Sequence, residues 1–132
     1  MPLSIELRPH EKIFINGAVI ANGPERTHIV LLNEAAVLRE KDILTEERAD
    51  TPCKQIYFSV QSIYMDPDNA PRYLQLYEQL SHEVRGAAPS TTPLMEVITE
   101  DLSQGRIYPA LKAARKLIEY ELELMNHGRP PA

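Results

Sequence analysis

The residues that bear most directly on function are five cationic side chains in the first third of the chain. Arg8 ends the first of several short segments with strand character, and Arg39 ends the last. An arginine at the end of a strand suits recognition of phosphates or base edges, because its planar guanidinium donates two parallel hydrogen bonds. The alternative is that these arginines form ordinary surface ion pairs with neighbouring glutamates. The candidate RNA-binding residues are Arg8, Lys12, Arg26, Arg39 and Lys41.

A second candidate set is aromatic and lies on two successive predicted helices, at helical spacing. Such rings could form a groove for a partner helix or a platform on which bases stack. The alternative is an inter-helix core whose hydroxyls reach the surface. The candidate groove residues are Tyr57, Tyr64, Tyr73 and Tyr77.

The residues that catalysis or metal binding would require are sparse. The four histidines are far apart in the sequence and form no i, i+4 pair, so no metal site is predicted. Cys53 lies on the apolar stripe of a predicted helix, which favours a buried thiol over a nucleophile. Glu119, Glu121 and Glu123 alternate along another helix and indicate a solvated face. We therefore expect no enzymatic activity and no metal, nucleotide or organic cofactor.

Composition sets the class of protein. The 132 residues are 43% hydrophobic and 25% charged, as in an ordinary globular protein. The net charge of −5 excludes an overall basic nucleic-acid-binding protein, although not a local basic edge. No apolar run approaches the roughly twenty residues that span a bilayer, and no signal peptide is evident. A single cysteine forms no internal disulfide, so we expect a cytoplasmic protein without membrane contact.

The elements that position the cationic residues are short strands. Leu3, Ile5 and Leu7 alternate with polar residues, and Ile13 and Ile15 repeat this period of two. The Asn16-Gly17 dipeptide predicts a tight hairpin. Further strands are expected over 18–21, 27–32 and 35–38. Together they predict a small antiparallel β-meander or barrel in residues 1–50, the candidate RNA-binding domain.

The period changes to that of a helix at Thr51-Pro52. Prolines placed at helix starts, where the missing N–H has no partner to lose, divide the remaining chain. Helices are expected from Thr51 to Asp66, from Pro71 to Gly86, from Thr92 to Gly105 and from Tyr108 to near Gly128. The fold class is therefore α+β, with a helical domain of about four helices over 51–127 and a flexible tail over 128–132.

Several blocks of sequence follow one another along the chain, among them Ile15-Asn16-Gly17-Ala18-Val19-Ile20, Val37-Leu38-Arg39-Glu40-Lys41-Asp42-Ile43-Leu44, Ala49-Asp50-Thr51-Pro52 and Tyr64-Met65-Asp66-Pro67. Through these blocks almost the whole chain resembles the FlbT family of flagellar post-transcriptional regulators. The resemblance implies a cytoplasmic bacterial regulator of flagellin synthesis, a repressor that binds the 5′ untranslated region of flagellin messenger RNA and promotes its decay. It also implies FlaF as a functional partner.

A weaker similarity, over residues 3–43, is to the carbon storage regulator family of small RNA-binding β-strand dimers. Arg8 and Arg39 match the two arginines with which that family binds RNA. The similarity implies a homodimer in which Arg8 of one chain lies beside Arg39 of the other.

The helical half favours a rival function. It is acidic and larger than a strand-based RNA-binding module needs, and its tyrosines could line a groove for an amphipathic helix. On this hypothesis the chain is a protein-binding flagellar regulator or chaperone that acts through flagellin or FlaF.

Overall fold

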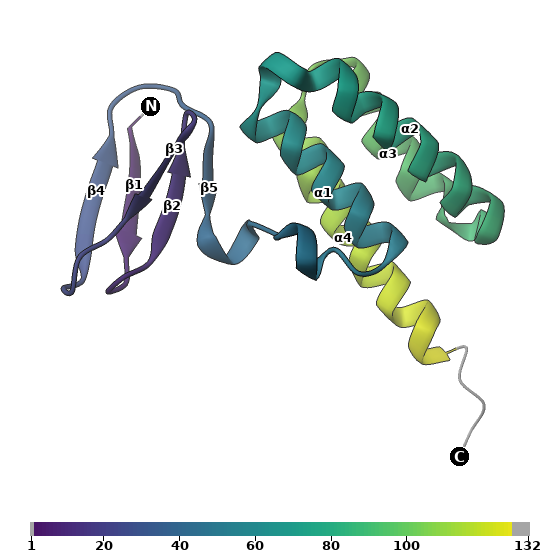
Figure 1. The fold of residues 1–132 in the computed structure, drawn as a ribbon, viewed down its shortest axis with the longest axis horizontal. Coiled ribbons are helices and arrows are strands. Elements are labelled where there is room, and N and C mark those ends of the chain that lie inside the picture. The colour runs from purple at the N-terminus through teal and green to yellow at the C-terminus, as the bar shows by residue number, and fades with distance from the viewer. Residues whose placement is uncertain (1, 128–132) are drawn as a thin grey trace. The chain divides into compact units, whose positions relative to one another are not determined.

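The computed structural model describes residues 2–127, and the predicted tail over 128–132 lies outside them. The chain forms two compact units, Met1–Ile43 and Leu44–Ala132, called here the strand unit and the helical unit (Figure 1). Five strands are followed by four α-helices among the described residues. The predicted α+β class is confirmed.

The strand unit contains two antiparallel sheets. One pairs β1 with β4, and the other has the order β3-β2-β5. The sheets do not close into a barrel, so that alternative is wrong. Of the five strands, only β2 and β3 are consecutive in the sequence and also paired, so the strand order is not that of a simple meander. The chain leaves the first sheet after β1 because Pro9 lacks an N–H and His10 has a φ of 61°. The strands are β1 Leu3–Leu7, β2 Lys12–Ile15, β3 Ala18–Ala21, β4 Thr27–Leu31 and β5 Val37–Arg39.

The predicted hairpin joins β2 to β3. Asn16 and Gly17 both have positive φ, 46° and 88°, and they connect the paired residues Ile15 and Ala18. A two-residue turn of this kind matches the twist of the flanking strands. The Asn16 side chain also accepts a hydrogen bond from the Ala36 N–H at 2.7 Å, which attaches the segment before β5 to the hairpin.

The core of the strand unit follows from the alternation of β1. Ile5 and Leu7 lie on one face and are buried together with Ile13. The register places Ile5 opposite Ile29, which adds a partly buried residue to the same face. The period of two therefore sets the buried face, as the sequence predicted.

The helical unit consists of α1 Pro52–Met65, α2 Ala70–Ala87, α3 Thr92–Ser103 and α4 Ile107–His127. The helix α1 packs against α2 and α4, and α3 packs against α4 (Figure 1). No helix within residues 2–127 is both long and apolar enough to cross a membrane. The largest fully buried apolar side chains of this unit are Ile56, Val60, Tyr77, Met95, Ile98, Leu111 and Leu117.

Two polar side chains fix the chain as it enters α1. Thr51 is the N-cap, and its hydroxyl accepts a hydrogen bond from the Lys54 N–H at 3.2 Å. Gln61, buried within α1, binds both backbone groups of Leu44: its amide oxygen accepts from the N–H at 2.7 Å, and its amide nitrogen donates to the carbonyl at 2.8 Å. Residues 44–51 are thereby attached to the helical unit.

Replacing Thr51 by alanine tests the cap. We expect Thr51→Ala to lower the free energy of unfolding of the helical unit by about 1–2 kcal/mol, because an N–H of α1 loses its acceptor. Thr45→Ala is the matched control, since Thr45 caps only the three-residue 3-10 helix Glu46–Arg48; its effect should stay within about 0.5 kcal/mol. Urea unfolding followed by circular dichroism measures both, and equal losses would contradict the assignment.

Candidate functional site

The five predicted cationic residues lie at one end of the strand unit. In the first sheet, Leu7 at the end of β1 pairs with Thr27 at the start of β4. In the second sheet, Arg39 at the end of β5 pairs with Ile13 near the start of β2. Lys41 follows on the 3-10 helix Glu40–Asp42. These five are all the lysines and arginines of residues 1–43. We call this region, defined by Arg8, Lys12, Arg26, Arg39 and Lys41, the cationic end.

The loop between β1 and β2, which carries Arg8, is hydrogen-bonded to the loop between β3 and β4, which carries Arg26. The His10 N–H donates to the Gly23 carbonyl at 2.9 Å, and the Asn22 N–H donates to the Glu11 carbonyl at 2.8 Å. The Asn22 side-chain amide donates to the Arg8 carbonyl at 2.8 Å. Figure 1 shows both loops at the lower end of the strand unit. The backbone that carries Arg8 is therefore held in place by the loop that precedes β4.

The cationic end is built around Glu11, one of the neighbouring glutamates that the sequence offered only as partners in surface ion pairs. This glutamate is only 6% exposed. Its Oε1 accepts a hydrogen bond from the Arg8 N–H at 2.8 Å, and its Oε2 accepts from Arg39 Nη2 at 3.0 Å. The Arg8 guanidinium also approaches it, with Nε 4.0 Å from Oε1. Arg8 and Arg39 thus reach the same carboxylate within one chain, whereas the similarity to carbon storage regulators places them side by side across a dimer.

The pKa of Glu11 is lowered from its ordinary value of 4.5, first by the hydrogen bond from the Arg8 N–H and then by Arg39. Burial opposes this shift, because removal from water disfavours the charged form. The hydrogen bonds and the nearby guanidiniums prevail, so Glu11 is ionised at neutral pH. A buried, ionised carboxylate needs its partner, and Arg39 supplies it.

The two arginines therefore differ in what they can offer a ligand. Arg39 Nη2 binds Glu11 and also donates to the Glu6 carbonyl at 2.7 Å, and its side chain is 36% exposed. The Arg8 side chain is 70% exposed. Arg26 is exposed as well and forms a surface ion pair with Glu6 at 3.3 Å. Arg8 and Arg26, with the exposed side chains of Lys12 and Lys41, are thus the cations that can reach a phosphate.

Two of the four candidate tyrosines are buried in the helical unit. The Tyr57 hydroxyl, on α1, accepts a hydrogen bond from Arg115 Nη2 on α4 at 3.3 Å. The Tyr77 hydroxyl, on α2, lies 2.7 Å from Thr99 Oγ1 on α3. Both rings belong to the packing between helices.

The other two tyrosines are half-buried. Tyr73 donates a hydrogen bond to Asp66 Oδ2 at 2.7 Å. The ring of Tyr64 packs against that of Tyr108 on α4, with 5.7 Å between centroids. All four tyrosines thus have polar or aromatic partners inside the helical unit.

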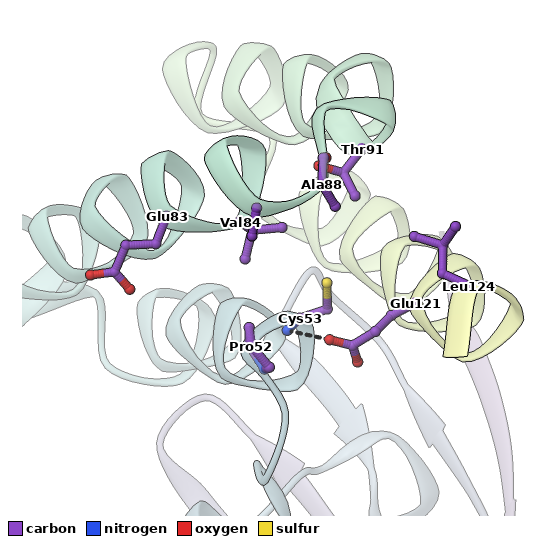
Figure 2. A pocket seen from close by; sticks show the side chains of 9 residues that line it. Pro52, Cys53, Glu83, Val84, Ala88, Thr91, Glu121 and Leu124 are labelled. Carbon is purple, nitrogen blue, oxygen red and sulfur yellow. Dashed lines mark hydrogen bonds between the residues drawn. The ribbon is translucent and has the colours of Figure 1, made fainter. Parts of the chain in front are cut away.

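The helical unit contains an open apolar pocket of about 290 Å³. Figure 2 shows Cys53 at the start of α1, Val84 and Ala88 at the end of α2, and Glu121 and Leu124 on α4 around it. Sequence analysis did not predict this pocket, since its walls come from α1, α2, the 3-10 helix Pro89–Thr91 and α4, which are distant in the sequence.

One wall of the pocket corrects a prediction. Glu121, expected on a solvated face, accepts hydrogen bonds from the Thr51 hydroxyl at 2.5 Å and from the Cys53 N–H at 3.1 Å. A carboxylate is favoured there because the first N–H groups of a helix have no partner within the helix. Cys53 is buried as predicted, and burial, assisted by Glu121, raises the pKa of its thiol to about 12. The thiol is therefore protonated at neutral pH.

The comparison with known families decides the family of the chain. The family described as "Flagellar protein FlbT" matches residues 3–125. The chain belongs to the FlbT family. The resemblance stated from the sequence blocks is thereby confirmed, whereas the similarity of residues 3–43 to carbon storage regulators stays a prediction.

Named relatives cover nearly the whole chain. The flagellum biosynthesis repressor protein FlbT of Caulobacter vibrioides is 39% identical over 129 residues, 96% of this chain and 92% of its own length. A probable flagellum biosynthesis repressor protein FlbT from Rhodopseudomonas palustris is 42% identical over 126 residues, 96% of this chain and 99% of the relative. Another, from Bradyrhizobium diazoefficiens, is 42% identical over 125 residues, 94% of this chain and 85% of the relative. No solved structure matches this chain significantly.

The carboxylate of Glu11 makes the stability of the strand unit depend on pH. A lowered pKa in the folded state stabilises the fold above the unfolded value of 4.5, and this contribution is lost as the pH falls through the folded value. We expect the stability difference between the parent and Glu11→Gln to be present at neutral pH and to shrink below pH 4.5. Unfolding monitored by the NMR amide signals of residues 2–43 measures it. Glu34→Gln, at an exposed position of the same unit, is the control and should follow the parent; a difference for Glu11→Gln that does not change with pH would contradict the prediction.

Removing Arg39 leaves the buried carboxylate of Glu11 without its charged partner and should therefore destabilise the strand unit. We expect Arg39→Ala to lower the free energy of unfolding of the strand unit by about 2 kcal/mol, because Glu11 and the Glu6 carbonyl lose a charged donor. Arg26→Ala is the matched control: it breaks an exposed pair and should change stability by less than about 0.5 kcal/mol. The same NMR unfolding experiment compares them, and similar effects of the two variants would refute the structural role of Arg39.

Proposed function

We propose that this chain represses flagellum biosynthesis after transcription, by binding the 5′ untranslated region of flagellin messenger RNA and promoting its decay. The names of its relatives support repression of flagellum biosynthesis and go no further, since the Caulobacter vibrioides protein is described as a flagellum biosynthesis repressor. The proposal gives this chain a binding role and no catalytic one. Decay of the messenger RNA then follows from binding to its 5′ untranslated region, called the leader below, and not from cleavage by this chain.

The observation that carries RNA binding is the gathering of every lysine and arginine of residues 1–43 at the cationic end. Chain segments 8–12, 26 and 39–41 come together there, so cations distant in the sequence form one surface region. Phosphate contacts give nucleic-acid binding most of its affinity, and a fixed arrangement of cations gives it register.

The charge balance of the strand unit predicts how such binding behaves. Residues 1–43 contain five lysines and arginines and six aspartates and glutamates, so their net charge is close to neutral. Affinity for arbitrary RNA is then low, because no broad positive field attracts it. Recognition depends on a leader whose phosphates and unpaired bases match the cationic end, as in other cases of single-stranded RNA recognition.

A titration of the full chain with fluorescent flagellin-leader RNA tests the proposal. We expect Arg8→Ala and Arg26→Ala each to weaken binding several-fold. Each should also reduce the slope of log K against log salt concentration by about 0.7, the value for one lost phosphate contact on a single strand. These two arginines are chosen because both are well exposed, whereas Arg39→Ala also perturbs the fold.

The matched control is Arg72→Ala, an exposed arginine on α2 of the helical unit. It should bind leader RNA like the parent, and an RNA of shuffled sequence should bind the parent more weakly. If Arg8→Ala and Arg26→Ala both bind like the parent, the cationic end is not the RNA site. If the parent shows no preference for the leader, the proposed function itself fails.

A further inference from the structure

The apolar pocket is formed by residues of the helical unit alone, whereas the proposed RNA site belongs to the strand unit. Its walls are the first turn of α1, the last turns of α2, the 3-10 helix Pro89–Thr91 and the end of α4 (Figure 2). Val84, Ala88 and Leu124 make its surface largely apolar. Neither Cys53, a protonated thiol, nor Glu121, which is bound to the start of α1, offers reactive chemistry there.

Leu124 on α4 is 38% exposed although it lines the pocket, so the apolar wall of the pocket is open to solvent. Met125, one helical turn after the pocket-lining Glu121, is exposed as well. Isolated apolar residues on a surface are common, but exposed apolar side chains in and beside the wall of an apolar pocket are typical of an interaction site. Its volume of about 290 Å³ is at the lower limit for a small-molecule site and suits a few anchoring side chains.

The charge around the pocket identifies the class of partner. Glu83 lines the pocket and is exposed at its rim. The nearby cation Lys54 is already paired with Asp50 at 3.2 Å. Residues 44–127 as a whole contain 8 lysines and arginines against 13 aspartates and glutamates. A ligand that is apolar on one side and basic around it would complement this surface.

We propose that this pocket is the docking site for the apolar face of a basic amphipathic helix from a partner protein. Apolar residues one helical turn apart enter between Val84, Ala88 and Leu124, and lysines or arginines beside them face Glu83. This is the helix-in-groove mode of recognition, in which anchors recur at i, i+3 or i+4 and i+7.

A second copy of this chain is a poorer occupant for an electrostatic reason. The apolar end of its α4 carries Glu119, Glu121 and Glu123. Docked in the pocket, that helix would bring these carboxylates toward Glu83, and like charges placed together at an interface are unfavourable.

Binding of a defined peptide to the full chain tests the proposal. The probe is a fluorescent synthetic peptide of leucine and lysine at amphipathic-helix spacing, and its counterpart has glutamate in place of every lysine. We expect the lysine peptide to bind saturably and to shift the NMR signals of Cys53, Val84 and Ala88. Leu124→Ala should weaken binding about tenfold, and Glu83→Lys several-fold.

Leu74→Ala is the matched control, because Leu74 on α2 and Leu124 on α4 are both 38% exposed and only Leu124 lines this pocket. It should bind the lysine peptide like the parent. Equal losses for the two leucine variants, or equal binding of the glutamate peptide, would overturn the proposal. So would a dimer by light scattering that Leu124→Ala converts to monomer, since a second copy would then occupy the pocket.

Discussion

The buried carboxylate of Glu11 is the interaction on which the strand unit depends. Its oxygens bind the turn after β1 through the Arg8 N–H and the end of β5 through Arg39. Arg39 also donates to the Glu6 carbonyl in β1. Because β1 and β5 belong to different sheets, this one guanidinium connects two sheets that share no backbone ladder. The position of the cationic end follows from that connection.

The cluster around Glu11 fixes the positions of β1 and β5 more than it adds to the free energy of unfolding. A buried ion pair costs desolvation on both sides, so its net contribution to folding is often small, whereas breaking it leaves an unpartnered charge. The strand unit is only 43 residues long, a size at which an apolar core alone gives marginal stability. A polar cluster that excludes other arrangements of β1 and β5 therefore complements the small core around Ile5, Leu7 and Ile13.

Local signals in the sequence predicted the elements well, because each depends on neighbouring residues. The period of two over Leu3–Leu7, the Asn16-Gly17 turn and the prolines at helix starts act within a few positions. Strand pairing and the partners of Glu11 and Glu121 depend on distant residues. Glu121 binds Thr51 and Cys53, about 70 positions earlier in the chain. Alternating glutamates on a helix look solvated until the end of another helix is known to lie beside them, and the pocket escaped prediction for the same reason.

Glu11 and Glu121 both accept hydrogen bonds from backbone N–H groups at the end of an element, but their other partners differ. Glu11 accepts from the Arg8 N–H and from Arg39, and the Arg8 guanidinium lies 4.0 Å from it while the Arg8 side chain stays 70% exposed. Glu121 accepts from two neutral donors, a hydroxyl and an N–H, whereas Glu11 also accepts from a guanidinium. The net charge of −5 does not say where the charges lie: residues 1–43 contain five lysines and arginines against six aspartates and glutamates, and residues 44–127 contain 8 against 13. On the two proposals above, the exposed cations of the strand unit would contact RNA phosphates, whereas the exposed Glu83 of the helical unit would face a basic protein segment.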